Sequence, residues 1–381
     1  MYFFTEKDPN YTVKGSRDPL GFQKIWQDAG KRLIPHLSTV SNNIKDFQIL
    51  CAAHCIRKQW KMEEEDFESF FIRFEQLMGY VRFRQDDSLG FNGVDKVRKI
   101  MSKEPSRVRI SNLGGDQLLS NQRNYGIWSK YNRVFSELRM GEAPEIDTIY
   151  APRIVELKSF FRQVGILARK KPNEASEVPT KDLDGYVDVL KHPGKEERKF
   201  FTDLLLTDTC GNELWKLLQR HKDLHDDYGL YELLYLLDKY SDNEGFKWLL
   251  RMIEHTEKVI CPMNRIFRYL QTRCYWTWEE IEQDKFIRGW RTKPDEAYLD
   301  GETRSLAYLL QLSNSELVRG LVARNEEVMN IRGFAPWVAI IDSGLEVNHY
   351  QGASSKSFNP DEDADNAYFL DTFLKIYHQL D

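Results

Sequence analysis

The feature that most constrains how this chain folds is the three- and four-residue spacing of its large apolar side chains, which recurs along most of the sequence. Residues 62–83 show it most clearly, because their apolar side chains share one helical face. That face consists of Phe67, Phe70, Phe71, Phe74, Leu77 and Met78. Glycine and proline are sparse, at 22 and 13 of 381 residues, which suits long helices joined by short loops. The pattern predicts a mainly α-helical, multi-helical protein.

The C-terminal region departs from this pattern. Two predicted helices, residues 305–312 and 316–329, precede a predicted two-stranded hairpin, residues 337–347. A helix–helix–hairpin succession is typical of a winged-helix-like unit. Such a unit places its second helix in a DNA groove and its hairpin on the backbone, or else docks another protein.

Acidic residues favour the docking role for this unit. Glu316, Glu326 and Glu327 lie on the second predicted helix and would repel phosphate. The predicted partner-binding residues are Trp337, Arg319, Arg324 and Arg332. The first hairpin strand is apolar on both faces, since Trp337 alternates with Val338 and the pattern continues to residue 341. We therefore expect it to pack against the 316–329 helix on one side and against a partner or the chain's last helix on the other.

Composition along the chain predicts three domains. Residues 170–182 are polar, contain Pro172 and Pro179 and lack periodicity, as expected of a linker. The predicted domains are a helical N-terminal domain with a basic face, residues 1–171, a helical middle domain, residues 183–300, and the winged-helix-like unit with an acidic loop and a last helix, residues 301–381.

Charge is unevenly distributed. The net charge is only -5, yet residues 96–139 hold ten Lys or Arg against three Asp or Glu. A basic stretch of this kind predicts contact with nucleic-acid phosphates. The predicted nucleic-acid-binding residues are Lys96, Arg98, Lys99, Arg107, Arg109, Arg123, Lys130 and Arg133.

Aromatic residues interleave with the second half of this stretch. Tyr125, Trp128 and Tyr131 would suit base stacking. With Phe135, however, they also fall at helical spacing, so a buried aromatic face beneath a basic outer face is the favoured interpretation.

No set of residues has the spacing that catalysis or a metal site requires. Cys51, His54 and Cys55 share a helical face but lack a fourth ligand, so core packing is favoured over zinc. A second group of potential metal ligands consists of Asp203, Asp208, His221, His225, Asp226 and Asp227. These residues suit a loop better than a rigid site. No cofactor is predicted, and the alternative to a binding role is a metal-dependent nuclease whose Asp and His ligands converge only in the fold.

Targeting signals and disulfide patterns are not evident. The five cysteines are an odd number without disulfide spacing, and no stretch has the roughly 18 apolar residues of a membrane span. The N-terminus lacks the pattern of a signal peptide. We expect a cytoplasmic protein that does not contact a membrane.

Two segments resemble known sequences. Pro19-Leu20-Gly21, Gly30, Leu33-Ile34-Pro35 and Leu37-Ser38-Thr39-Val40 resemble the N-termini of bacterial proteins found in anti-phage defence gene clusters, and residues 333–347 resemble their C-terminal part. The resemblance carries no catalytic residues. It implies a multi-gene defence system in which this protein accompanies an ATPase, helicase or nuclease. Together these features predict a non-catalytic subunit of a defence complex that docks such a partner and contributes to DNA binding.

Overall fold

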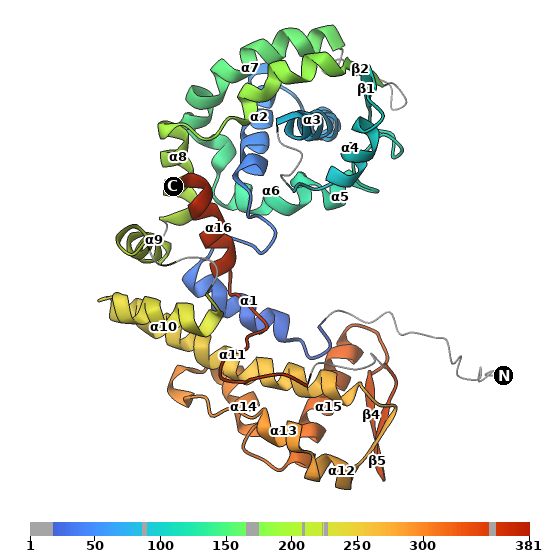
Figure 1. Ribbon diagram of the computed structural model, residues 1–381, viewed down its shortest axis with the longest axis vertical. Helices are drawn as coiled ribbons and strands as arrows, with labels where there is room; N and C mark the ends of the chain where they lie inside the picture. Colours follow the sequence, from blue (N-terminus) through green and yellow to red (C-terminus); the bar gives the residue numbers. More distant parts are fainter. Residues whose placement is uncertain are drawn as a thin grey trace, which may run out of the picture. The chain divides into compact units, whose positions relative to one another are not determined.

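A computed structural model describes residues 18–85, 90–164, 175–207, 210–222, 224, 228–349 and 356–381, with only the backbone course for 156–164 and 187–189 (Figure 1). The protein is mainly helical, as predicted, with small antiparallel sheets. It forms two compact units. Unit 1 comprises Met1–Pro35 and Glu213–Leu370, and unit 2 comprises His36–Asn212 and Asp371–Asp381. The predicted domain limits at 171 and 183 fall inside unit 2, and the limit at 300 falls inside unit 1.

Unit 2 is a helical assembly around two long helices. Its helices are α2 (Ile44–Trp60), α3 (Glu64–Gln85), α4 (Val94–Met101), α5 (Gln122–Tyr125), α6 (Ile127–Glu137), η1 (Met140–Glu142), α7 (Pro144–Val164), η2 (Thr180–Leu190), α8 (Lys195–Phe201) and η3 (Thr202–Leu206), joined by most of α16 (Leu370–Leu380). Helix α9 (Gly211–Arg220) begins in this unit and continues into unit 1. Helix α2 is buried along most of its length and contacts α3, α6 and α7 (Figure 1). The predicted aromatic face of α3 is confirmed, because Phe67, Phe70, Phe71 and Phe74 are almost fully buried.

Buried polar side chains fix the packing around α2. The carboxylate of Glu197 accepts hydrogen bonds from Tyr150 Oη at 2.5 Å, from Gln48 Nε2 at 2.9 Å and from both terminal nitrogens of Arg153. A buried charge is tolerated when it is paired and hydrogen-bonded in this way. The network joins α8 to α2 and α7.

The two-stranded sheet of unit 2 corrects the linker prediction. Strand β1 (Arg107–Ile110) pairs antiparallel with β2 (Ser176–Pro179). Ser176 and Val178 are buried, so this part of the predicted linker is an ordered strand. Residues 170–174 of that prediction lie outside the described residues.

Unit 1 is built on a 27-residue helix, α11 (Glu244–Leu270). The other elements are α1 (Phe22–Leu33), α10 (Leu230–Tyr240), β3 (Tyr275–Thr277), α12 (Trp278–Gln283), α13 (Lys285–Gly289), η4 (Glu296–Tyr298), α14 (Gly301–Leu309), α15 (Asn314–Ile331), β4 (Val338–Ile341) and β5 (Gly344–Val347). Helices α1, α10 and α14 contact α11, and one apolar core runs through the unit (Figure 1).

The C-terminal helices and hairpin form as expected, but the sheet has a third strand. The strand order is β3-β5-β4, all antiparallel, with Trp276 opposite Leu345. Trp276 is fully buried and its indole nitrogen donates to the Leu270 carbonyl at 2.7 Å. Gly344 lies so close to the Trp276 carbonyl that a Cβ atom would collide with it, at 1.8 Å. Glycine at this position therefore permits the pairing of β3 with β5.

Candidate functional site

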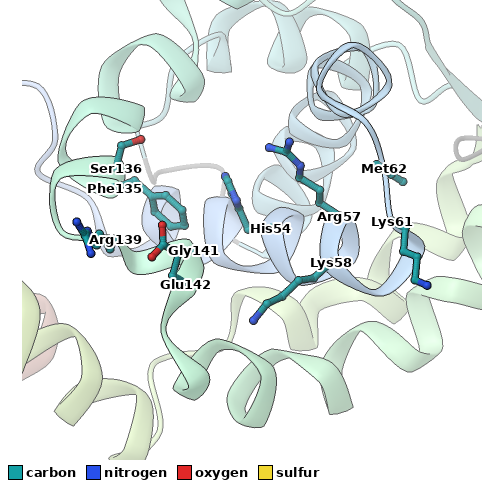
Figure 2. Close-up of a pocket in the computed structure, with 10 residues that line it drawn as sticks. All are labelled: His54, Arg57, Lys58, Lys61, Met62, Phe135, Ser136, Arg139, Gly141 and Glu142. Atoms are coloured by element: carbon teal, nitrogen blue, oxygen red, sulfur yellow. The ribbon is translucent and has the colours of Figure 1, made fainter.

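A cavity lined by several basic side chains lies within unit 2. It has a volume of about 450 Å³. Figure 2 shows its lining side chains coming from two sides, the C-terminal part of α2 and the end of α6 with η1. We call it the basic pocket, and define it by His54, Arg57, Lys58, Lys61, Met62, Phe135, Ser136, Arg139, Gly141 and Glu142.

Helix geometry explains why cations gather there. Helix α2 ends at Trp60, with Arg57 and Lys58 in its last turn and Lys61 as its C-cap. Cations are favoured at this end because the helix dipole places partial negative charge there. On the opposite wall, the segment after α6 turns through Arg139 into η1.

Backbone conformation singles out two of these cations. Lys61 and Arg139 both adopt the left-handed region, each with φ near 49°. A residue with a Cβ atom pays roughly 1–2 kcal/mol for this conformation, which glycine avoids. Lys61 and Arg139 therefore occupy positions where glycine would have the lower backbone conformational energy. Both residues line the same pocket.

Ion pairing divides the pocket's cations into two kinds. Arg57 pairs with Glu64 at 2.6 Å, and Lys58 pairs with Asp147 at 2.7 Å. Lys61 and Arg139 are exposed and form no ion pair with any described residue. The only acid among the lining residues is Glu142. The pocket therefore offers two uncommitted positive charges beside two that are held in position.

His54 forms an aromatic part of the wall. Its ring lies 4.6 Å from that of Phe135 and 4.9 Å from that of Phe67, centroid to centroid. Burial and the nearby Arg57 cation lower the pKa of His54 to about 4, so the ring is neutral at neutral pH. Its Nε2 atom is buried and has no hydrogen-bond partner among the described residues. A Cβ atom at Gly141 would lie 3.0 Å from His54 Nδ1, so glycine lets the η1 segment approach the ring.

The cations predicted to bind nucleic acid lie elsewhere in unit 2, and most have partners. Five form ion pairs: Arg98 with Asp95, Arg107 with Glu177, Arg109 with Asp116, Arg123 with Glu68 and Arg133 with Glu137. Lys96 donates to the Gly115 carbonyl at 2.7 Å, and Lys130 donates to Asn92 Oδ1 at 2.6 Å. Lys99 is exposed on α4 without an ion pair to any described residue. Most of the excess positive charge read from the sequence is thus locally compensated.

The aromatic residues of this stretch are mainly core residues, which confirms the favoured interpretation. Tyr131 and Phe135 are buried, and the Trp128 ring packs 5.3 Å from that of Phe71. Tyr125 differs, because 58% of it is exposed.

The arginines predicted to bind a partner make contacts with other residues of unit 1. Arg324 donates to the Leu20 carbonyl at 2.6 Å and to Glu302 at 2.9 Å. Arg332 pairs with Asp18 at 3.2 Å. The guanidinium of Arg319 lies 3.6 Å from the centre of the Trp278 ring.

Trp337 is only 4% exposed, and its backbone N–H donates to Asn325 of α15 at 2.8 Å. The expected packing of this strand against the second helix is confirmed, since β4 contacts α15.

The candidate metal ligands that the structure describes do not come together. Cys51 and Cys55 are buried thiols, which confirms core packing, and burial raises the pKa of Cys55 to about 11. Asp203 pairs with Lys199 four residues earlier, and His221 stacks on Tyr240. Asp208, His225, Asp226 and Asp227 lie outside the described residues. Within the described ranges, no three His, Cys, Asp or Glu side chains form a group able to hold a metal ion.

No protein-family model matches the chain, and no curated protein or solved structure is significantly similar to it. Among the helices of the described ranges, none combines the length and apolar character needed to cross a bilayer.

Proposed function

We propose that this protein is a non-catalytic binding subunit that holds nucleic-acid phosphate in the basic pocket of unit 2. The observation that carries the proposal is that Lys61 and Arg139 are among the lining residues of one cavity and form no ion pair with any described residue. Phosphate contacts by Lys and Arg supply most of the sequence-independent affinity for nucleic acid. Both cations are also held in a costly backbone conformation, which is common at functional sites.

Unit 1 is proposed as the part that docks a partner. Its β3-β5-β4 sheet, preceded by α11 and combined with α14 and α15, supports a winged-helix-like unit with α15 as the second helix. Arg324 and Arg332 of that helix region are engaged within the unit, whereas Glu326 and Glu327 are exposed. Such a surface suits a protein better than a phosphate backbone.

The setting we propose is a bacterial anti-phage defence complex. The support is the resemblance of the Pro19–Val40 region and of residues 333–347 to proteins of defence gene clusters. In that setting the partner is an ATPase, helicase or nuclease, and this chain contributes DNA binding in the cytoplasm.

The test is oligonucleotide binding by fluorescence anisotropy over a range of salt concentrations. The variant Lys61→Ala/Arg139→Ala should weaken binding and reduce the slope of log affinity against log salt by about 1.4–1.8, since each lost contact contributes roughly 0.7–0.9. The matched control is Lys99→Ala/Lys103→Ala, which removes two exposed cations of the predicted basic stretch. If the control flattens the slope and the pocket variant does not, nucleic acid binds the predicted stretch and not the pocket.

A further inference from the structure

We propose that another cavity of unit 2 docks a short segment of a partner protein, in which apolar side chains are flanked by lysine or arginine. The cavity has a volume of about 470 Å³ and is lined by the N-terminal part of α7 and by α8 and η3. We call it the acidic groove, and define it by Pro144, Glu145, Ile149, Glu196, Phe200 and Leu204. It shares no lining residue with the basic pocket, so this inference does not rest on phosphate binding there.

The base of the acidic groove is apolar. Its most buried lining residue, Phe200, is 5% exposed, and the ring packs 5.3 Å from that of the fully buried Phe201. Ile149 and Leu204 are only half-buried, so the chain itself leaves part of their apolar surface in contact with water. Covering this surface is favourable, because apolar area is then removed from water. The occupant should therefore present apolar side chains.

The lining carries an excess of negative charge. Lys199 pairs with Asp203, so the charges of these two side chains compensate each other. Glu145 and Glu196 are exposed and form no ion pair with any described residue. Each lies in the first turn of a helix, where the dipole favours an acid. A segment with basic residues complements this charge, and the two carboxylates need not converge, because separate lysine or arginine residues can pair with each.

The exposure of the polar lining residues favours a protein segment over other occupants. Glu145, Thr148 and Asp203 are all exposed, so the groove is open to solvent along its polar lining. A small-molecule site normally buries most of its ligand, whereas a chain segment can enter and leave an open groove. Nucleic acid is disfavoured, because carboxylates repel phosphate.

Buried contacts between α7 and α8 hold the groove in shape. Glu197, the neighbour of Glu196 in α8, accepts hydrogen bonds from Tyr150 Oη at 2.5 Å and from Arg153 Nη2 at 2.6 Å, both on α7. The following segment, η3, is a π-helical turn, a rare conformation that is frequent at functional sites. A groove with fixed walls loses less conformational entropy when it binds, which favours recognition of a short segment.

The experiment selects random peptides displayed on phage against the full chain, with counter-selection on Leu204→Glu. We expect the enriched peptides to carry apolar residues flanked by lysine or arginine. A labelled synthetic peptide of the consensus sequence should bind Glu145→Lys/Glu196→Lys at least about tenfold more weakly than the unchanged protein, as measured by anisotropy. The matched control is Glu65→Lys/Glu232→Lys, which reverses two exposed first-turn acids elsewhere and should retain the affinity. Thermal unfolding of each variant checks that it is folded.

A charge exchange separates complementarity from damage to the fold. The consensus peptide with its basic residues replaced by glutamate should bind Glu145→Lys/Glu196→Lys more tightly than it binds the unchanged protein. The inference would be overturned by a selection that enriches no basic peptide, or by binding that survives both the charge reversal and Leu204→Glu. Self-association of the chain that depends on Leu204, without peptide binding, would also overturn it and assign the groove to a second copy.

Discussion

The cations around α15 in unit 1 and those around the basic pocket in unit 2 look alike in the sequence but are used differently. Arg324 and Arg332 donate to backbone carbonyls and pair with acids, and Arg319 covers an aromatic ring. Lys61 and Arg139 form no ion pair with any described residue and are both among the lining residues of the basic pocket. The first group holds its unit together, while the second group is available to a ligand.

This difference shows that the number of cations in a segment is a poor guide to binding. Residues 96–139 are the most basic stretch considered, yet five of their arginines are paired with acids. Exposed ion pairs contribute little to stability, but each acid lowers the local positive potential that would attract phosphate. Substitutions in unit 1 should therefore change stability, and substitutions in the pocket should change binding.

The largest expected effect is on the stability of unit 1. Trp337→Ala should lower the free energy of unfolding by about 3–5 kcal/mol, because the ring is almost fully buried. Chemical denaturation measures this loss. The matched control is Trp248→Ala, at a tryptophan that is 43% exposed, with a cost of about 1 kcal/mol or less. Equal costs would mean that Trp337 is not a core residue, and weaker oligonucleotide binding by stable Trp337→Ala would restore the hairpin as a DNA contact.

The next effect concerns the pH dependence of stability beneath the pocket. The pKa of His54 is about 4 in the folded protein and 6.5 in an ordinary environment. Between these values the unfolded chain binds a proton that the folded protein does not, so the unfolding free energy should rise with pH by about 3 kcal/mol. The contribution is complete above pH 6.5 and is lost as the pH falls toward 4.

His54→Gln should remove this rise, while the exposed His192→Gln should leave it in place. Denaturation between pH 4 and 7 measures the difference in slope. A slope unchanged in His54→Gln would show that the ring is not held neutral in the fold.

A smaller loss is expected at the arginines of unit 1. Arg324→Ala removes charged hydrogen bonds to Leu20 and Glu302 and should cost about 1.5–3 kcal/mol without changing oligonucleotide affinity. Arg288→Ala, at an exposed arginine, serves as the control and should change stability by no more than about 0.5 kcal/mol. If Arg324→Ala were stable but bound DNA more weakly, Arg324 would contact DNA. The distinction between structural cations in unit 1 and binding cations in the basic pocket would then be wrong.

The smallest expected effect is an increase in stability, whereas the tryptophan and arginine substitutions above lower it. Lys61→Gly and Arg139→Gly should each stabilise the protein by about 0.5–1 kcal/mol, because glycine relieves the left-handed conformation, while both weaken oligonucleotide binding. Lys99→Gly, within helix α4, should instead destabilise by about 1 kcal/mol. If both pocket glycine variants were destabilised as much as Lys99→Gly, the backbone would not favour glycine there.

Local patterns in the sequence predicted the local elements well. The apolar spacing in residues 62–83 identified the buried face of α3, and the helix predicted at residues 316–329 lies within α15. The hairpin predicted at residues 337–347 contains β4 and β5. Helical periodicity and strand alternation depend only on neighbouring residues, so they can be recognised in the sequence without knowledge of the tertiary structure.

Contacts between residues far apart in the chain could not be predicted from the sequence in the same way. Strand β3 has only three residues and pairs with β5, about seventy residues later. Strand β2 ends in Pro179 and is otherwise short and polar, which resembles a linker until Val108 and Val178 are seen opposite each other. The basic pocket was missed for the same reason, since Lys61 and Arg139 are far apart in the chain and Arg139 stood out only as the last cation of residues 96–139. Only the tertiary structure shows which cations already have an acidic partner.

The measurement that tests the central claim most directly is amide hydrogen exchange with and without an oligonucleotide. It reports protection along the described chain without any substitution. The account predicts slower exchange in residues 54–62 and 136–142, which line the basic pocket, and unchanged exchange in α15 and the β4–β5 hairpin. Protection centred on α15 and the hairpin, with none around Lys61 and Arg139, would contradict it.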